Sequence, residues 1–470
     1  MTFKRILLTA ICACVFCSAL SINDANAQKK AKGKAVEPAP AAVEFQLPSL
    51  ETDAEKAERM KWFTDARFGM FIHWGLYALP ARHEWVKNSE YITDADYQKY
   101  FDHFNPDLFN PKEWARQAKE AGMKYVVITT KHHEGFCLFD SKYTDYKAPN
   151  TPAGRDLLRE FVDAFRAEGI HIGFYYSLLD WHHPDYTLDT CHPLRPKPDV
   201  APERAKAIID SLNQGRNMDV YRQYMKDQVT ELLTNYGKID IIWFDFTLTG
   251  QKEAPDWDSE GLLKLARTLQ PGIIVDDRLG LRDTWGGWDI ITPEQRKLES
   301  CATWHGKKVH WETCQTFSGS WGYYRDETSW KSSAMLIELL IETVSKAGNL
   351  ILNVGPTARG EFDYRAQDRL KAIGEWMHFN SKAIYGCTEA PEEFKKPDNS
   401  LLTYNPETNT LYISLLTYPM KRIDAKFMDK VEYAQFLHDG SEISFDEDGF
   451  LLPILKPNTE IPVIEVFLKK

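Results

Sequence analysis

From about residue 61 onwards, short apolar runs typical of buried strands alternate with amphipathic helical patterns. Near-continuous apolar strands separated by helices are typical of parallel βα units. The expected strands lie within residues 68–75, 125–133, 170–178, 239–246, 272–278, 288–294, 308–314 and 349–356. This succession predicts an α/β fold, a (β/α)8-like TIM barrel, over residues 51–386.

The clearest helical patterns lie between the first strands, at residues 111–122, 155–169 and 218–237. Each of them ends in a glycine (Gly122, Gly169 or Gly237), the residue that most often terminates a helix. After the fifth and sixth expected strands no comparable helical pattern is found. We therefore expect the barrel to be imperfect there.

Past residue 386 the pattern changes to short runs of alternating polar and apolar residues with turn signals between them. Such runs are typical of antiparallel strands that bury one face. We expect a small C-terminal antiparallel β-sandwich over residues 387–470.

The N-terminus has the features of a targeting segment. Lys4 and Arg5 precede an apolar run at residues 6–20, and Ala25 and Ala27 fit a small-x-small cleavage site. We expect a signal peptide at 1–27 and a flexible linker at 28–50, which is rich in Ala, Lys and Pro. No later segment is long and apolar enough to span a membrane. This predicts an exported protein, periplasmic or at the cell surface of a bacterium.

Composition narrows the function classes. The net charge of −11 argues against a polyanionic partner such as nucleic acid. Aromatic residues make up 13% of the chain, with 14 Trp, and their flat faces favour a carbohydrate ligand. Eight Cys are present, but three fall in the expected signal peptide and the other five are irregularly spaced, so no disulfide framework is evident.

Polar residues occur at or near the ends of most expected strands. In a barrel of this type the active site lies at the carboxyl ends of the strands. The polar residues in question are His73, His132, His133, Tyr175, Tyr176, Asp245, Arg278, Glu294, Glu312 and Asn353. Their joint occurrence predicts a site for a polyhydroxylated ligand.

Two carboxylates in different environments are sufficient to hydrolyse a glycosidic bond. Asp245 is the candidate nucleophile, because it is short, ends a rigid strand and could be kept ionised by Arg278. Spacing alone leaves Glu294, Glu312 and Glu84 open as the acid.

A metal site is the rival interpretation of the pair His132 and His133. Adjacent residues of a strand point to opposite faces, and no carboxylate-rich motif completes a ligand set. We therefore expect neither a metal nor a cofactor.

Several segments resemble those of the glycoside hydrolase family 29 α-L-fucosidases. The resemblance covers about residues 62–385 and is carried by "WFTDARFGMFIHWGLYALPARHEWV", "TKHHEGF", "GIHIGFYYSLLDW", "WFD", "DDR", "TPEQ", "WGYY" and "AGNLILNVGP". It implies that Asp245 is the nucleophile of a retaining reaction and that Glu294 is the general acid/base. It implies a substrate-binding role for nine residues: His73, Glu84, Trp85, His132, His133, Tyr175, Trp243, Arg278 and Trp321.

The resemblance thus implies an exo-acting α-L-fucosidase that forms a covalent glycosyl-enzyme and acts on fucosylated oligosaccharides or glycoconjugates. Phe246 is a departure, since many members carry Gly or Met after the nucleophile. That difference could reshape the pocket around the C5 substituent or on the leaving-group side. Two alternatives remain, an α-L-galactosidase on the same scaffold and a catalytically silent sugar-binding protein. No pattern in the sequence predicts an oligomeric state.

Overall fold

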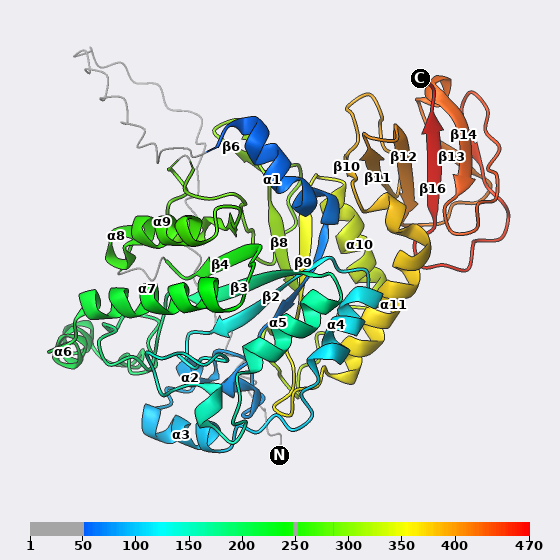
Figure 1. Cartoon of the computed structure of the whole chain (residues 1–470). Coiled ribbons are helices and arrows are strands. Elements are labelled where there is room, and N and C mark those ends of the chain that lie inside the picture. The colour runs from blue at the N-terminus through cyan, green and yellow to red at the C-terminus, as the bar shows by residue number, and fades with distance from the viewer. Residues whose placement is uncertain (1–50, 248–251, 285) are drawn as a thin grey trace, which may run out of the picture. The chain divides into compact units, whose positions relative to one another are not determined.

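A computed structural model describes residues 51–247, 252–284 and 286–470 (Figure 1). The signal peptide and linker expected at residues 1–50 lie outside the described residues. The central element is a seven-stranded parallel sheet in the order β5-β4-β3-β2-β1-β9-β8. Its strands are β1 (Phe68–Ile72), β2 (Tyr125–Lys131), β3 (His171–Ser177), β4 (Ile241–Asp245), β5 (Ile274–Val275), β8 (Glu312–Thr316) and β9 (Asn349–Val354).

An irregular segment closes this sheet into a barrel. On one side, residues 290–294 form a single parallel bridge to Asp276, directly after β5. On the other side they form single parallel bridges to Trp311, directly before β8, and to Cys314 within β8. This segment corresponds to the strand expected at 288–294. The prediction of an imperfect barrel is also confirmed, because in the described chain only a 3₁₀ helix and the small hairpin β6–β7 lie between β5 and β8.

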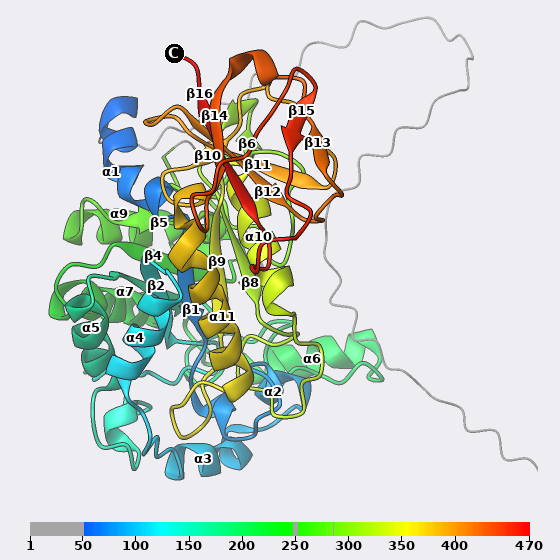
Figure 2. The ribbon, with the colours of Figure 1, turned by 90° about the vertical axis from the view of Figure 1, so that its right-hand side faces the viewer.

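Helices cover the outside of the barrel (Figures 1 and 2), and neighbours contact each other: α11 with α4 and α10, α4 with α5, and α7 with α9. Their bounds are α4 (Pro111–Glu120), α5 (Leu157–Ala167), α7 (Met218–Asn235), α9 (Ser259–Leu269), α10 (Ser333–Val344) and α11 (Tyr364–Asn380). The three helices expected from the sequence are present. Gly122, Gly169 and Gly237 follow them with φ of 87°, 74° and 74°, a backbone conformation that glycine adopts without strain.

Shorter elements occupy the loops. They are α2 (Val86–Ser89), α3 (Asp94–Asp102), α6 (Pro202–Leu212), α8 (Ala254–Trp257), β6 (Thr303–Trp304), β7 (Lys307–Lys308) and five 3₁₀ helices, η1 (Leu76–Ala78), η2 (Ala148–Asn150), η3 (Asp277–Leu279), η4 (Ser381–Ala383) and η5 (Met428–Lys430).

The alternation of side chains along each strand separates two cores. Outward residues such as Ile242 and Phe244 of β4 pack with the helices, whereas the inward residues Ile241 and Trp243 belong to a second cluster inside the barrel. That inner cluster also contains Met60, Phe63 and Ala66 of α1 (Asp53–Ala66). Helix α1 therefore closes the barrel at the amino ends of the strands and leaves the carboxyl ends for a ligand.

The C-terminal part is antiparallel, as expected. A five-stranded sheet has the order β10-β11-β12-β16-β14 and is accompanied by the pair β13–β15. The bounds are β10 (Thr388–Glu389), β11 (Ser400–Asn405), β12 (Thr410–Leu415), β13 (Arg422–Asp424), β14 (Val431–Phe436), β15 (Gly449–Leu451) and β16 (Val463–Leu468). These strands enclose a hydrophobic core of their own. Within residues 51–247, 252–284 and 286–470, every helix is too short or too polar to cross a lipid bilayer.

Candidate active site

Asp245 is the last residue of β4, and the alternation that points Ile241 and Trp243 into the barrel points Asp245 inward as well. It is 8% exposed. Its Oδ2 accepts a hydrogen bond from the Tyr175 hydroxyl at 2.8 Å, and its Oδ1 accepts one from Arg278 Nη1 at 2.9 Å. Burial opposes ionisation, but the charge of Arg278 and these hydrogen bonds outweigh it and hold the pKa of Asp245 below its usual value. This is the environment that a carboxylate nucleophile requires.

Arg278 also binds the second carboxylate. The same Nη1 donates to Glu294 Oε2 at 2.9 Å. Glu294 lies on the segment that closes the barrel, and its side chain is 37% exposed. The guanidinium is fixed by Nε donation to Thr292 Oγ1 at 3.0 Å and lies over the Trp243 ring at 4.5 Å. One rigid cation therefore positions both acidic groups.

The separation of these two groups limits the chemistry. Because they share one donor nitrogen, Asp245 Oδ1 and Glu294 Oε2 lie at most twice 2.9 Å apart. Retaining glycosidases hold their carboxyl groups about 5–5.5 Å apart, whereas inverting enzymes need about 6.5–9.5 Å to admit a water molecule. The arrangement has the dimensions of the retaining class.

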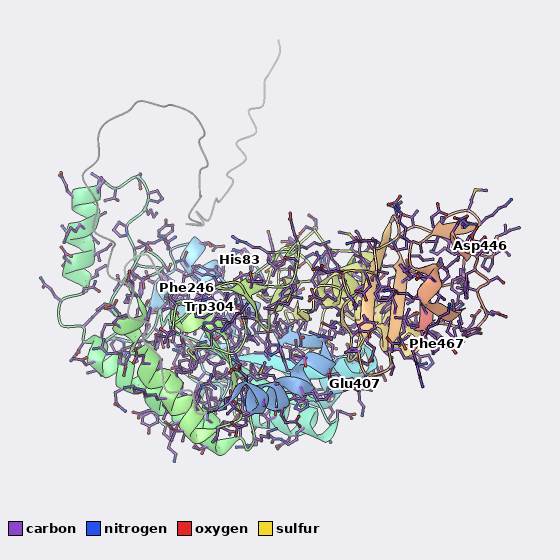
Figure 3. The ribbon with its side chains drawn as sticks, turned by 90° about the horizontal axis from the view of Figure 1, so that it is seen from above. His83, Phe246, Trp304, Glu407, Asp446 and Phe467 are labelled. Carbon is purple, nitrogen blue, oxygen red and sulfur yellow. The ribbon has the colours of Figure 1, made fainter. Side chains whose placement is uncertain are left out.

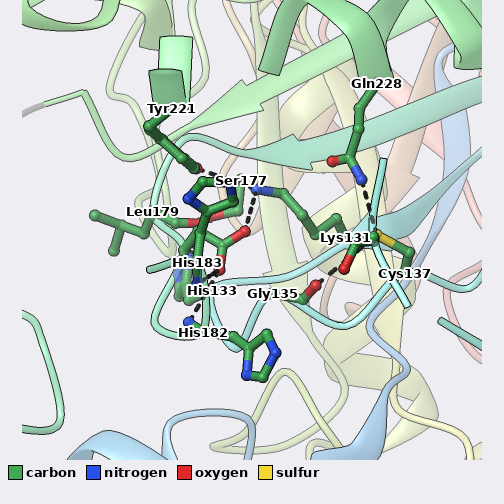
Figure 4. Close-up of polar contacts among 12 residues, drawn as sticks. Lys131, His133, Gly135, Cys137, Ser177, Leu179, His182, His183, Tyr221 and Gln228 are labelled. Atoms are coloured by element: carbon green, nitrogen blue, oxygen red, sulfur yellow. Dashed lines mark hydrogen bonds and ion pairs between the residues drawn. The ribbon is translucent and has the colours of Figure 1, made fainter. Parts of the chain in front are cut away.

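Two histidines each have one ring nitrogen fixed. His73 Nδ1 contacts Asn353 Oδ1 at 2.6 Å, and the Asn353 amide nitrogen donates to Trp321 O at 2.7 Å, so the Asn353 oxygen must accept. His133 Nδ1 contacts Ser177 Oγ at 2.7 Å, and this hydroxyl donates to Leu179 O (Figure 4). Both histidines therefore carry their proton on Nδ1.

The same two rings are neutral. Burial lowers the pKa of His73 to about 4 and that of His133 to about 3. Each ring consequently has an unprotonated Nε2, which can accept a hydrogen bond from a ligand hydroxyl. A site built from acceptors of this kind suits a sugar.

His132 and His133 do not point to opposite faces, so that part of the sequence argument was wrong. Their ring centroids are 4.0 Å apart, and both rings contact Tyr175. The reason is that the β2–β3 register shifts between Thr129 and Lys131 and β2 ends at Lys131, before either histidine. In the part of the chain that the structure describes, no three His, Cys, Asp or Glu side chains are grouped so that they could hold a metal ion.

Three tryptophans surround these polar groups. Trp243 lies beneath Arg278, and Trp321 packs against His73 with ring centroids 5.1 Å apart. Trp85 packs against His133 at 5.1 Å. The three aromatic rings thus belong to the same cluster of side chains as the candidate carboxylates and histidines.

Glu84 has a different environment from Glu294. Its Oε2 accepts hydrogen bonds from the backbone nitrogens of Trp321 at 3.2 Å and Gly322 at 2.8 Å. Glu84 therefore joins the loop of Trp85 to the loop of Trp321.

A family model described as Alpha-L-fucosidase matches residues 36–382. The chain is 30% identical to the human tissue α-L-fucosidase over 408 residues, 79% of this chain and 78% of that protein. It is 31% identical to an α-L-fucosidase of Dictyostelium discoideum over 361 residues, 70% of this chain and 71% of that protein.

The chain belongs to the α-L-fucosidase family.

Solved α-L-fucosidases have the same fold. Isoenzyme 1 from Paenibacillus thiaminolyticus matches with a TM-score of 0.81 and 42% identity, covering 88% of this chain and 100% of that one. A family 29 α-L-fucosidase of Bacteroides thetaiotaomicron matches with a TM-score of 0.74 and 30% identity, covering 88% and 96%. That enzyme was solved as a trapped covalent intermediate in complex with 2-fluoro-fucosyl fluoride. The family, the barrel fold and the retaining α-L-fucosidase activity expected from the sequence are therefore confirmed.

Glu312 was wrongly placed at the carboxyl end of a strand. It is the first residue of β8 and is fully buried, where it accepts hydrogen bonds from Tyr125 at 2.5 Å and Trp243 Nε1 at 3.2 Å. At about 3.3 Å per residue, the two ends of a five-residue strand lie roughly 13 Å apart. Glu312 therefore lies at the amino end of the barrel, away from the family's expected site.

Tyr176 is also outside the site. It points outward from β3 and donates to Gln228 of α7 at 2.9 Å. Two contributions were missed in the sequence: Ser177, which fixes His133, and the role of Asn353 in fixing His73. The position of Ser177 at the end of β3 was the available signal.

Proposed function

We propose that Asp245 attacks the anomeric carbon of a terminal α-L-fucoside while Glu294 protonates the leaving oxygen. The C–O bond to the leaving group breaks, and an ester forms between the sugar and Asp245. Glu294 then removes a proton from water, which attacks the same carbon and releases fucose and the Asp245 carboxylate. The observation that carries this assignment is the single Arg278 nitrogen bound by both carboxylates.

Arg278 suits both steps. In the free enzyme its Nη1 contacts both carboxylates and so holds the proposed nucleophile and the proposed proton donor side by side. Once Asp245 is esterified, Arg278 faces Glu294 alone. The guanidinium then positions the Glu294 side chain that takes the proton from water.

The histidines would recognise the hydroxyls of the sugar. His73 and His133 present Nε2 as an acceptor, and the buried His132 Nδ1 has no hydrogen-bond partner within the described chain. An unpaired buried polar atom is costly, and a sugar hydroxyl would satisfy it. The nearby tryptophan faces would pack against the apolar side of the deoxysugar.

We further propose that the substrate is a fucosylated oligosaccharide or glycoconjugate and that the protein is exported, to the periplasm or cell surface. The printed names of the relatives support the substrate class, and the charged and apolar pattern of residues 1–27 supports export. Cell fractionation with N-terminal sequencing tests the latter. A mature chain starting near Gln28 in the exported fraction is expected, and an intact Met1 in the cytoplasm would contradict it.

The reaction is tested by following hydrolysis of 4-nitrophenyl α-L-fucoside by proton NMR. Because two displacements at one carbon restore its configuration, the α-anomer of fucose must appear first. A first-formed β-anomer would contradict the mechanism. The corresponding α-L-galactoside, run in parallel, should be cleaved more slowly if the site is built for the 6-deoxysugar.

A further inference from the structure

Phe246 follows Asp245 directly and has a φ of 74°. Positive φ is uncommon for any residue other than glycine, and for a bulky side chain it is an outlier. Strain of this kind persists only where the surrounding structure imposes it, and it occurs preferentially at functional sites.

The backbone on both sides of Phe246 is held in place. Asp245 O accepts a hydrogen bond from Leu178 N at 3.0 Å, and Thr247 O accepts one from Trp257 Nε1 at 2.8 Å. The Thr247 hydroxyl also donates to the carbonyl of Arg278. These contacts leave Phe246 between two fixed peptide units, so its conformation is part of the fold.

The unusual backbone changes where the ring lies. The alternation of β4 would send residue 246 away from the barrel interior, to the side opposite Asp245. Instead the Phe246 ring packs against His133, with centroids 5.1 Å apart, and against Trp85 at 5.4 Å. Phe246 belongs to the barrel part of the chain, where it is labelled in Figure 3. The ring of the strained residue therefore lies beside His133 and Trp85, two of the candidate substrate-binding residues.

The Phe246 ring is less buried than the neighbouring groups that would contact the fucose. His133 and Tyr175, which would contact the fucose, are only 2% and 1% exposed. Phe246 and Trp85 are only partly buried and lie farther out. Trp85 rests in turn on Trp181, with ring centroids 5.2 Å apart, which supports it from below.

We infer that Phe246, braced by Trp85, forms an aromatic shelf that binds the sugar of the leaving group. Pyranose rings such as galactose or N-acetylglucosamine present an apolar C–H face that packs on flat aromatic rings. The inference rests on the proposed function and adds the residue that selects the leaving group. In this assignment Phe246 determines specificity, and the bond cleavage is left to Asp245 and Glu294.

The test compares two substrates that share the fucosyl group. Fucosyl fluoride has a leaving group too small to reach the shelf, whereas a fucosylated lactose carries a full sugar there. Of the fucosylated lactoses with different linkages, the one that the wild type cleaves fastest is used. The variants are Phe246→Leu, which removes the aromatic ring, and Phe246→Tyr, which retains it. Phe467→Leu in β16, also labelled in Figure 3, is the matched control because Phe467 is another partly buried phenylalanine.

Phe246→Leu should lower kcat/KM for the fucosylated lactose by about tenfold and for fucosyl fluoride by less than about twofold. The ratio of the two kcat/KM values should stay at its wild-type value in Phe246→Tyr and in Phe467→Leu. An equal loss on both substrates would overturn the inference, because the ring would then serve the fucose or the fold. Failure of the wild type to hydrolyse fucosyl fluoride would instead refute the proposed function.

The backbone argument has a separate test. Phe246→Gly should have a higher Tm than Phe246→Ala, since both remove the ring but only glycine adopts a positive φ without strain, and both should lower the same kcat/KM ratio. An unchanged ratio in these variants would overturn the shelf even if the glycine variant were the more stable of the two.

Discussion

Asp245 and Glu294 accept hydrogen bonds from the same nitrogen, Nη1 of Arg278, each at 2.9 Å. They come from different parts of the barrel, β4 and the irregular segment that closes it. Their environments also differ, since Asp245 is buried and also bonded to Tyr175, whereas Glu294 is partly exposed. We propose that this asymmetry suits Asp245 to the role of nucleophile and Glu294 to the role of proton donor and acceptor.

The choice of acid is tested by comparing Glu294→Ala with Glu312→Gln. Loss of the general acid/base should lower kcat by about 10²–10⁴-fold. Azide should rescue Glu294→Ala on an activated aryl fucoside, because the small anion can attack the glycosyl-enzyme without a base. Glu312→Gln should retain most of the activity. Azide rescue at position 312 but not at 294 would reverse the assignment.

The hydrogen bond from Tyr175 should be visible in the pH profile. It favours the ionised form of Asp245 and so contributes to the low pKa of that group. In Tyr175→Phe the pKa of Asp245 should rise, moving the acid limb of kcat/KM to higher pH. The rate at the optimum should fall about tenfold, since a hydrogen bond to a charged group is worth about 1.5–3 kcal/mol. Tyr176→Phe is the control, because that hydroxyl points away to Gln228, and an equal shift there would contradict the account.

Ser177 should act through the tautomer of His133. Without its hydroxyl, the Nδ1 proton loses its acceptor and the imidazole can exchange tautomers. For Ser177→Ala we expect kcat/KM to fall about fivefold, the loss of one ordinary hydrogen bond. Proton–nitrogen NMR of the imidazole should show Nδ1–H in the wild type and a mixture in the variant. A pure Nδ1–H form in Ser177→Ala would refute the role given to the serine.

Glu312 should make stability depend on pH. Burial raises its pKa from 4.5 to about 7, so the folded state holds a proton that the unfolded state releases. Its contribution is fully present below pH 4.5 and is lost as the pH rises through about 7. Glu312→Gln should not show this loss of stability, because glutamine does not ionise.

The free energy of unfolding of Glu312→Gln, relative to wild type, should therefore rise by up to about 3 kcal/mol between pH 4.5 and pH 8. Denaturant titrations at the two pH values measure it. An equal difference in the free energy of unfolding between variant and wild type at both pH values would contradict the buried position of Glu312.

Local signals made much of the fold predictable. Helices α4, α5 and α7 combine an apolar face with a terminal glycine, and each ends where that glycine adopts a positive φ. The position of Asp245 at the end of β4 was predictable because it directly follows an apolar run typical of a buried strand. In these cases the deciding interactions lie within a few residues.

The errors arose where distant contacts decide. A strand was expected at residues 308–314, but the strand is the polar stretch Glu312–Thr316. Its first residue, Glu312, accepts hydrogen bonds from Tyr125 and Trp243 of other strands. A register shift after Thr129 reoriented the histidine pair. Such partners lie far away in sequence, so periodicity alone carries no information about them.

The central claim, a covalent bond between Asp245 and the anomeric carbon, is tested most directly by mass spectrometry after incubation with 2-fluoro-fucosyl fluoride. The mass should rise by one fluorofucosyl group, and peptide mapping should place the added mass on Asp245. Asp245→Asn should remain unlabelled. Labelling at another carboxylate, or labelling that survives this substitution, would contradict the account.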